Sequence, residues 1–380
     1  MDSKHGISMT RRSFLTAAGG ILASLAVPAA AGKAQASPPR QAPTPPPDPE
    51  WAFGQSHPAA LDLWGRITDP GSPYYDKPGA DAKVIGFLHW NDVMPLFEVI
   101  HAAAPGNSNP HNDVWYRITG GYIYTAHIQP MKPYHMPTEI AQISTQIDQK
   151  PGFWAEVIVP YTMGYNGPSG AVLLTDTGDA TMLMYASAHH VMDVKPDDAG
   201  FLWYKILDDK KGAKPFWALA RHLRMIQPDD LTPIHPGVQG KKIVISLADQ
   251  KLTCYEGDQV VLTSLVSSGG GGFGTPKGDH AVVFKQPSRH MYSDPAEEAF
   301  SDPNFFDLPG VPFNSFFTTE GHAIHGTYWH GDYGRPRSHG CVNVPPEVAR
   351  WVFRWVDPYT PPDVGTNGSS KNPGTPVTVT

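Results

Sequence analysis

The sequence predicts a mainly β protein. Of its 380 residues, 40 are proline and 37 are glycine, a content that favours turns and short strands over long helices. Short runs of aromatic and β-branched residues, such as Trp115-Tyr116-Arg117-Ile118, recur between turn residues and are typical of half-buried strands. An apolar content of 40% over this length suffices for two or three hydrophobic cores. We therefore expect several β domains in series.

The first 36 residues predict an export signal. Thr10-Arg11-Arg12-Ser13-Phe14-Leu15 precedes a Gly/Ala-rich apolar stretch over 16–31, the pattern of a twin-arginine (Tat) signal. Ala34-Gln35-Ala36 offers a cleavage site, so the mature chain is expected to start at Ser37. Retention as a membrane anchor is the alternative, but the stretch is shorter than the roughly 20 residues of a span. We expect a protein exported to the periplasm, the cell wall or the medium.

The proline-rich segment 37–50, with Pro-Pro-Pro at 45–47, predicts an extended linker. Two β modules are then expected, at 51–135 and 150–236, because one unit occurs twice. Trp115-Tyr116-Arg117-Ile118 and a later Ile128-Gln129-Pro130 correspond to Trp203-Tyr204-Lys205-Ile206 and Ile226-Gln227-Pro228. Each copy resembles a small SH3-like β-barrel. Its aromatic residues fit a core better than a ligand groove.

A third domain is expected over 240–358. Strands are predicted at 242–246, 251–255 and 259–267, and the glycine run 269–272 is read as a flexible turn, since no Gly-Lys-Ser/Thr follows it. The long segment 286–319 is expected to cover the site described below. Pro345-Pro346-Glu347 begins a helix over 348–356. Its positive N-terminal end is expected near the thiolate of Cys341, where it would lower the thiol pKa modestly. A disordered tail is predicted for 359–380.

The chemistry of the chain is expected at Cys341. It lies in Ser338-His339-Gly340-Cys341-Val342-Asn343, close after His325, and a cysteine nucleophile needs an imidazole to take its proton. We expect His325 to be the base and later the acid, although spacing alone does not exclude His339. The N–H groups of Gly340 and Cys341 are candidate oxyanion donors. Cys254, in a strand-like run, is expected in the core.

These residues resemble the signature of the L,D-transpeptidases, which crosslink peptidoglycan through an active-site cysteine. The resemblance spans 241–358 and includes His325-Gly326-Thr327, the Thr275-Pro276-Lys277-Gly278 turn and the cysteine motif. It implies a β-sandwich domain in which the Gly326 carbonyl holds the far ring nitrogen of His325. It also implies that His339 orients or stabilises the site and does not take the proton. It also implies that Ser338 and Asn343 bind substrate, Asn343 standing where the family usually has arginine.

The expected partners are peptidoglycan stem peptides and the cell-wall matrix, with no cofactor and no metal. The net charge of −7, without a basic run outside the leader, argues against nucleic acid. The two modules are expected to position the enzyme on the wall without taking part in chemistry. The oligomeric state is open, with a monomer as the expectation.

Several alternatives stay open at this point. The acceptor of the acyl group can be a second stem (crosslinking), water (an L,D-carboxypeptidase) or a protein lysine (anchoring). The chain can also be a non-catalytic wall-binding protein. A zinc hydrolase is a further possibility, because His322, His325, His330, His339 and Cys341 lie close together in the sequence. Against zinc, His322 and His325 are three apart and are expected on opposite faces of a strand.

Overall fold

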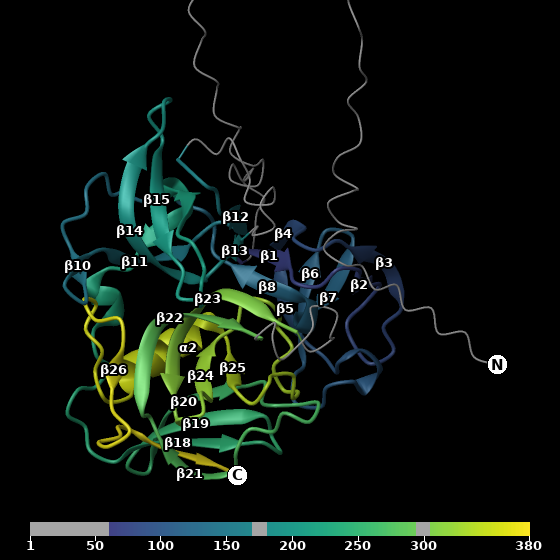
Figure 1. The fold of residues 1–380 in the computed structure, drawn as a ribbon. Helices are drawn as coiled ribbons and strands as arrows, with labels where there is room; N and C mark the ends of the chain where they lie inside the picture. The colour runs from purple at the N-terminus through teal and green to yellow at the C-terminus, as the bar shows by residue number, and fades with distance from the viewer. Residues whose placement is uncertain (1–60, 169–180, 294–304) are drawn as a thin grey trace, which may run out of the picture. The chain divides into compact units, whose positions relative to one another are not determined.

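The computed structural model describes residues 61–168, 181–293 and 305–380 (Figure 1). The mainly β class is confirmed, since strands dominate and α2 (Pro346–Trp355) is the single α-helix among these residues. The predicted signal, the linker and the start of the first module lie outside the described residues. Within the described ranges, no helix is long and apolar enough to cross a membrane.

The first module consists of two sheets, one of three strands in the order β4-β1-β8 and one of five in the order β3-β2-β7-β6-β5. Trp115 is fully buried between Tyr75 and Tyr124, with ring centroids 5.2 and 5.3 Å away. These three aromatic residues therefore form part of the module's core. The strands are β1 (Leu63–Ile67), β2 (Ser72–Tyr75), β3 (Val84–Leu88), β4 (Val93–Leu96), β5 (Glu98–His101), β6 (Val114–Ile118), β7 (Gly121–Tyr124) and β8 (Ile128–Met131).

The second module is built on a five-stranded sheet in the order β16-β15-β14-β11-β17, with the pairs β9-β10 and β12-β13 beside it. Tyr204 and Ile206 of its repeated unit are fully buried. The strands are β9 (Gln146–Ile147), β10 (Lys150–Pro151), β11 (Phe153–Val157), β12 (Tyr161–Met163), β13 (Met182–Met184), β14 (Ala188–Pro196), β15 (Leu202–Leu207), β16 (Phe216–Leu219) and β17 (Leu223–Met225).

The repeated sequence unit has the same order of elements in both modules. Strands β6 and β7 lead into a short 3₁₀ helix (Thr125–His127) and then β8, while β15 and β16 lead into a 3₁₀ helix (Ala220–His222) and then β17. The assignment of either module to the SH3-like class stays a prediction.

The third domain contains two five-stranded sheets. The first has the order β20-β19-β18-β27-β21 and the second the order β25-β24-β23-β22-β26. The strands are β18 (Lys241–Ser246), β19 (Lys251–Glu256), β20 (Gln259–Leu265), β21 (Gly278–Ala281), β22 (Phe284–Tyr292), β23 (Asp307–Phe316), β24 (Ala323–Gly326), β25 (Val342–Val344), β26 (Asn367–Gly368) and β27 (Pro376–Val379).

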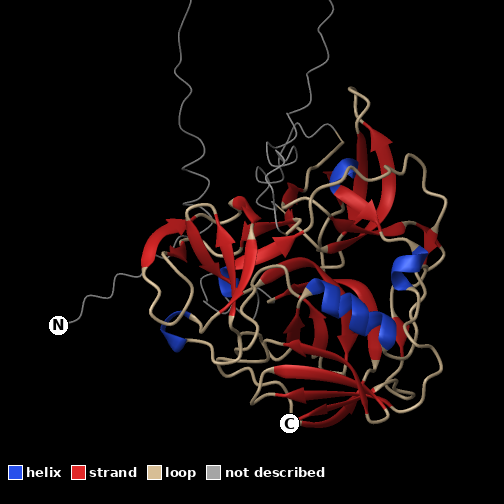
Figure 2. Ribbon diagram, turned by 180° about the vertical axis from the view of Figure 1, so that it is seen from behind, coloured by secondary structure: helices blue, strands red, loops and turns tan. Residues whose placement is uncertain are grey.

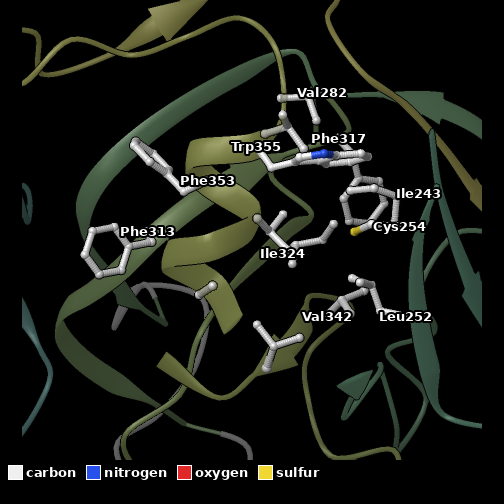
Figure 3. Packing of buried hydrophobic residues seen from close by; sticks show 14 of the residues in the cluster. Ile243, Leu252, Cys254, Val282, Phe313, Phe317, Ile324, Val342, Phe353 and Trp355 are labelled. Carbon is white, nitrogen blue, oxygen red and sulfur yellow. The ribbon is translucent and has the colours of Figure 1, made fainter. Parts of the chain in front are cut away.

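Apolar side chains from both sheets and from α2 form one core. Figure 3 shows Ile243 and Leu252 of the first sheet, Ile324 and Val342 of the second, and Trp355 of the helix in this cluster. Cys254 is fully buried among them, as predicted. Helix α2 packs against β23 and β24, as seen from behind in Figure 2. The buried Lys285 Nζ donates to the carbonyls of Phe353 and Val356 at 2.7 and 2.9 Å and so caps the helix end.

The prediction of a disordered tail over 359–380 is wrong. Strand β27 lies inside the first sheet, parallel to β18 and antiparallel to β21, and Val377 and Val379 are buried. The alternation in Pro376-Val377-Thr378-Val379 is the signal that the proline- and glycine-rich stretch before it obscured.

The expectation for 286–319 also needs correction. Half of this segment belongs to the paired strands β22 and β23 of the second sheet, with Gln286 opposite Asn314 and Arg289 opposite Val311. Residues 294–304, between the two strands, lie outside the described part of the chain.

Candidate active site

The pairing of two short strands brings the predicted site residues together. Strands β24 and β25 run parallel with His325 opposite Asn343 and Ile324 opposite Val342. Because side chains alternate along a strand, Ile324 and Val342 face the core while His325 and Asn343 share the other face. Cys341 lies two residues before Asn343 and packs against Ala323, which shares that face with His325. His325 thus lies on β24, and the cysteine lies in the turn directly before the neighbouring strand β25.

Cys341 is partly exposed as a residue, and its thiol points inward to the turn before β24. Its Sγ donates to the carbonyl of Gly321 at 3.7 Å. Gly340 has a φ of +106°, which favours glycine, and a Cβ there would lie 2.9 Å from Nε2 of His322. His322 itself is held through Nδ1 by the Thr318 hydroxyl at 2.9 Å. His322 is therefore an imidazole beside the nucleophile, which the sequence analysis considered only as a zinc ligand.

Ser338 stabilises the turn over residues 338–341, which contains Cys341. Its hydroxyl accepts from the Gly340 N–H at 3.1 Å and donates to the Cys341 carbonyl. The Gly340 N–H thus has an acceptor within the turn, and its oxyanion role stays a prediction. The hydroxyl of Thr275, from the predicted Thr-Pro-Lys-Gly turn, donates to the Gly340 carbonyl at 2.9 Å. These contacts give Ser338 a structural place in the turn, and its substrate-binding role stays a prediction.

His325 is held at both ring nitrogens. Its Nδ1 lies 3.0 Å from the Gly326 carbonyl, the contact that the resemblance implied, and its Nε2 lies 3.1 Å from Asn343 Nδ2. The amide oxygen of Asn343 lies 3.1 Å from His330 Nε2. Asn343 is 2% exposed, and its amide bridges two buried histidines. Its role in binding substrate stays a prediction.

Burial keeps both reacting groups neutral. It lowers the pKa of His325 to about 4, against a smaller opposing effect of the hydrogen bond to Gly326. Burial also raises the pKa of the Cys341 thiol to about 11, although a hydrogen bond with the Ala323 backbone opposes the shift. The expectation that the start of α2 lowers the thiol pKa is therefore wrong in its net effect: desolvation of the thiolate is the larger influence here.

His339 lies at the rim of the site. Its ring is partly exposed and packs on Phe273 of the glycine-rich turn, with centroids 4.5 Å apart. The run 269–272 is folded tightly against the motif, since Gly270 N–H donates to the Ser338 carbonyl at 2.9 Å. His339 thus links the turn to the cysteine motif, while His325 occupies the strand position facing Asn343.

The first module reaches this site, which the sequence analysis did not foresee. Arg66, buried to 1% exposure, donates through its guanidinium to the Tyr328 carbonyl, three residues after His325. The residues around Arg66 in the sequence give no signal of a partner 262 positions later.

The described residues contain no group of three or more His, Cys, Asp or Glu side chains arranged to hold a metal ion.

Comparisons with known proteins agree with the motif. Residues 240–379 match the model of the YkuD family, the L,D-transpeptidase catalytic domain, so the resemblance is confirmed for this part of the chain. No curated protein matches.

Solved structures of L,D-transpeptidases match at low identity. A mutant enzyme from Enterococcus faecium is 24% identical with a TM-score of 0.29, over 38% of this chain and 52% of that chain. L,D-transpeptidase 1 from Mycobacterium tuberculosis is 21% identical with a TM-score of 0.28, over 37% and 60%. An L,D-transpeptidase from Mycobacterium smegmatis is 14% identical with a TM-score of 0.29, over 66% and 100%. The match spans about half the length of the E. faecium enzyme.

Proposed function

We propose that the chain is an exported peptidoglycan L,D-transpeptidase that transfers acyl groups through a thioester on Cys341. The observation that carries the proposal is the placement of Cys341 directly before β25, the strand that pairs in parallel with the His325 strand β24, within the residues that match the catalytic-domain model. The twin-arginine pattern before residue 37 supports export. The family implies stem peptides as donors.

The acylation step follows from the groups present. The Cys341 thiol leaves the Gly321 carbonyl and gives its proton to Nε2 of His325 as the Asn343 amide releases that nitrogen, while Sγ forms a bond to the donor carbonyl. The tetrahedral intermediate collapses, the peptide C–N bond breaks, and the leaving amine takes the proton from His325. The Cys341 N–H is the backbone donor proposed for the oxyanion. Because thiol and imidazole are both neutral at rest, the proton moves only as the carbonyl is attacked.

Deacylation reverses these roles. An acceptor amine loses a proton to His325 and attacks the thioester, and the thiol is regenerated. An amine of a second stem gives a crosslink, a protein lysine gives an anchored protein, and water gives an L,D-carboxypeptidase. We propose crosslinking as the main outcome, from the family that residues 240–379 match.

The experiment is mass analysis of stem-peptide products after incubation with the chain from Ser37 onward. A crosslinked product with loss of the terminal D-residue is expected from the wild type and from Cys254→Ala, and none from Cys341→Ala. Only a shortened stem in the wild type would assign a carboxypeptidase. If Cys341→Ala retains turnover while remaining folded, the cysteine mechanism is wrong.

A further inference from the structure

We propose that the first β-module is a structural part of the active site: it holds the loop that presents His330 to Asn343, and Asn343 in turn fixes His325 as the tautomer with hydrogen on Nδ1. We call residues 327–334 the catalytic loop. The inference deepens the proposed function, on which its catalytic readout rests, and it replaces the expectation that both modules stand apart from the chemistry.

The backbone of the catalytic loop packs directly on the first module. The Gly331 N–H donates to the Ala126 carbonyl at 3.2 Å. A Cβ at Gly331 would lie 2.3 Å from the Thr125 carbonyl oxygen, closer than side-chain carbons approach, so only glycine fits. Gly334, with φ of +96°, would place a Cβ 2.8 Å from Asn109 Oδ1. At these two glycines the loop therefore approaches the module too closely for any larger residue.

Side chains of the module hold both ends of the loop. At one end, Arg66 binds the Tyr328 carbonyl and is itself fixed by Gln129 Oε1 at 2.6 Å and Asn91 Oδ1 at 2.8 Å. At the other end, Asn109 Nδ2 and Asn112 Nδ2 each donate to the Tyr333 carbonyl at 2.9 Å. A buried guanidinium with three acceptors is well satisfied, and removing one contact leaves a buried polar group unpaired.

The loop sets the hydrogen positions on His330. The Asp332 N–H donates to His330 Nδ1 at 3.2 Å, so this nitrogen is an acceptor and the hydrogen of the neutral ring is on Nε2. His330 Nε2–H then donates to Asn343 Oδ1, Asn343 Nδ2 donates to His325 Nε2, and His325 Nδ1–H donates to Gly326.

The reversed assignment fails at both ends. If Asn343 were flipped, His330 would need its hydrogen on Nδ1, facing the Asp332 N–H. His325 would likewise need its hydrogen on Nε2, leaving Nδ1 without a hydrogen to give the Gly326 carbonyl. One amide orientation therefore satisfies every member of the chain. It leaves His325 Nε2 without a hydrogen, as the acceptor of the Asn343 amide, so this nitrogen can take the thiol proton once the amide turns away. His330 is a positioning residue that acts through Asn343.

The first test needs no variant and no substrate. In the full chain labelled with ¹⁵N-histidine, long-range ¹H–¹⁵N NMR at neutral pH should show His325 neutral, with Nδ1 protonated and Nε2 bare, and His330 with the opposite pattern. A protonated His325 Nε2 would overturn the inference, whatever reaction the protein performs. If this pattern is found but no acyl transfer occurs, the inference stands and the proposed function fails.

The second test separates the loop from the module. Gly331→Ala should push the loop off Thr125, alter the His325 spectrum and slow acylation of Cys341 at least tenfold, mainly in kcat. Gly167→Ala is the matched control, because a Cβ at Gly167 meets nothing within 4 Å. Acylation within twofold of wild type and an unchanged spectrum in Gly331→Ala would contradict the role of the module.

The third test addresses His330 itself. His330→Leu removes the donor to Asn343 and should slow acylation by a similar factor, whereas His330→Gln keeps an N–H at the same reach and should restore most of it. Equal rates in the two variants, with a His325 spectrum like that of the wild type in both, would show that His330 does not position the base. The spectrum of the unmodified chain decides the matter if either variant fails to fold.

Discussion

At the residue scale, the motif predicted which residues come together but only one of their hydrogen bonds, that of His325 with Gly326. Cys341, His325 and the Gly326 contact follow from the signature, because spacing and residue type determine them. Asn343 was expected to face substrate, yet the parallel register of β24 and β25 places it against His325, with His330 behind it. Register is a property of the paired strands, so a single sequence gives no access to it.

Alkylation of Cys341 should depend on pH in a defined way. Since burial raises the thiol pKa to about 11, little thiolate exists at neutral pH, and the rate should rise nearly tenfold per pH unit through pH 9. The measurement is the rate of iodoacetamide labelling at Cys341 by peptide mass analysis, in Cys254→Ala to leave one thiol. A rate that levels off near pH 7 would indicate a preformed thiolate–imidazolium pair.

At the element scale, strands that are short or follow loop-like sequence were the least predictable. The helix was expected at 348–356 and runs from Pro346 to Trp355, because proline is accepted in the first turn. Strand β27 was missed, since four residues after a Pro/Gly-rich stretch carry a weak signal. Its partners β18 and β21 lie about 100 or more residues earlier, so the neighbouring sequence does not reveal the pairing.

Strand β27 should be essential for folding of the third domain. Burial of Val377 and Val379 contributes roughly 1.5–3 kcal/mol each. Loss of the strand also removes the pairing of β21 and leaves β18 with β19 as its partner on one side alone. A chain ending at Ser370 should therefore lose its cooperative melt. Replacing exposed Asn372 by Asp serves as the control. A truncated chain that melts like the wild type would restore the prediction of a dispensable tail.

A second element-scale feature is an ionic cluster between β22 and the end of β15. His290, 6% exposed at its side chain, lies between Asp208 at 2.7 Å and Asp307 at 2.6 Å. Burial alone would lower its pKa, but the hydrogen bonds and charges of the two carboxylates raise it overall. For Asp307 burial acts upward, yet its contacts with His290 and Lys210 lower its pKa to about 2.

The cluster should stabilise the fold over a limited pH range. The contribution of His290 is complete below its usual pKa of 6.5 and is lost as pH rises through the raised folded value. The contribution of Asp307 is present above pH 3.8 and is lost as pH falls toward 2.

His290→Gln should lower the free energy of unfolding by about 3–5 kcal/mol near pH 5.5, and this deficit should shrink as pH rises. Urea unfolding at several pH values measures this deficit, with His101→Gln at an exposed position as the control. A deficit that grows as pH rises would contradict the account.

At the scale of the whole molecule, the order of modules could be predicted, but not their contribution to the site. The repeated unit indicated two β modules, and the Trp-Tyr pair of the unit is buried in both copies. Contacts such as Arg66 with Tyr328 and Gly331 with Ala126 join segments about 200 or more residues apart, and no local pattern encodes them.

Removal of the modules should therefore reduce chemistry as well as wall binding. A chain beginning at Val238 loses the partners of Tyr328, Gly331 and Tyr333, so acylation even by a soluble stem peptide should fall at least tenfold. The measurement is single-turnover acylation beside a thermal melt. A truncated domain that melts cooperatively and acylates at the full rate would show that the modules act only as spacers or wall binders.

The central claim is that Cys341 carries the acyl group. The most direct measurement is to quench the full mature chain during reaction with a stem-peptide donor and to map the covalent adduct by mass spectrometry. The account predicts a thioester on the peptide that contains Cys341, with the donor short of its terminal D-residue, and no adduct in Cys341→Ala. An adduct on Cys254, or products formed with Cys341 unmodified throughout, would contradict it.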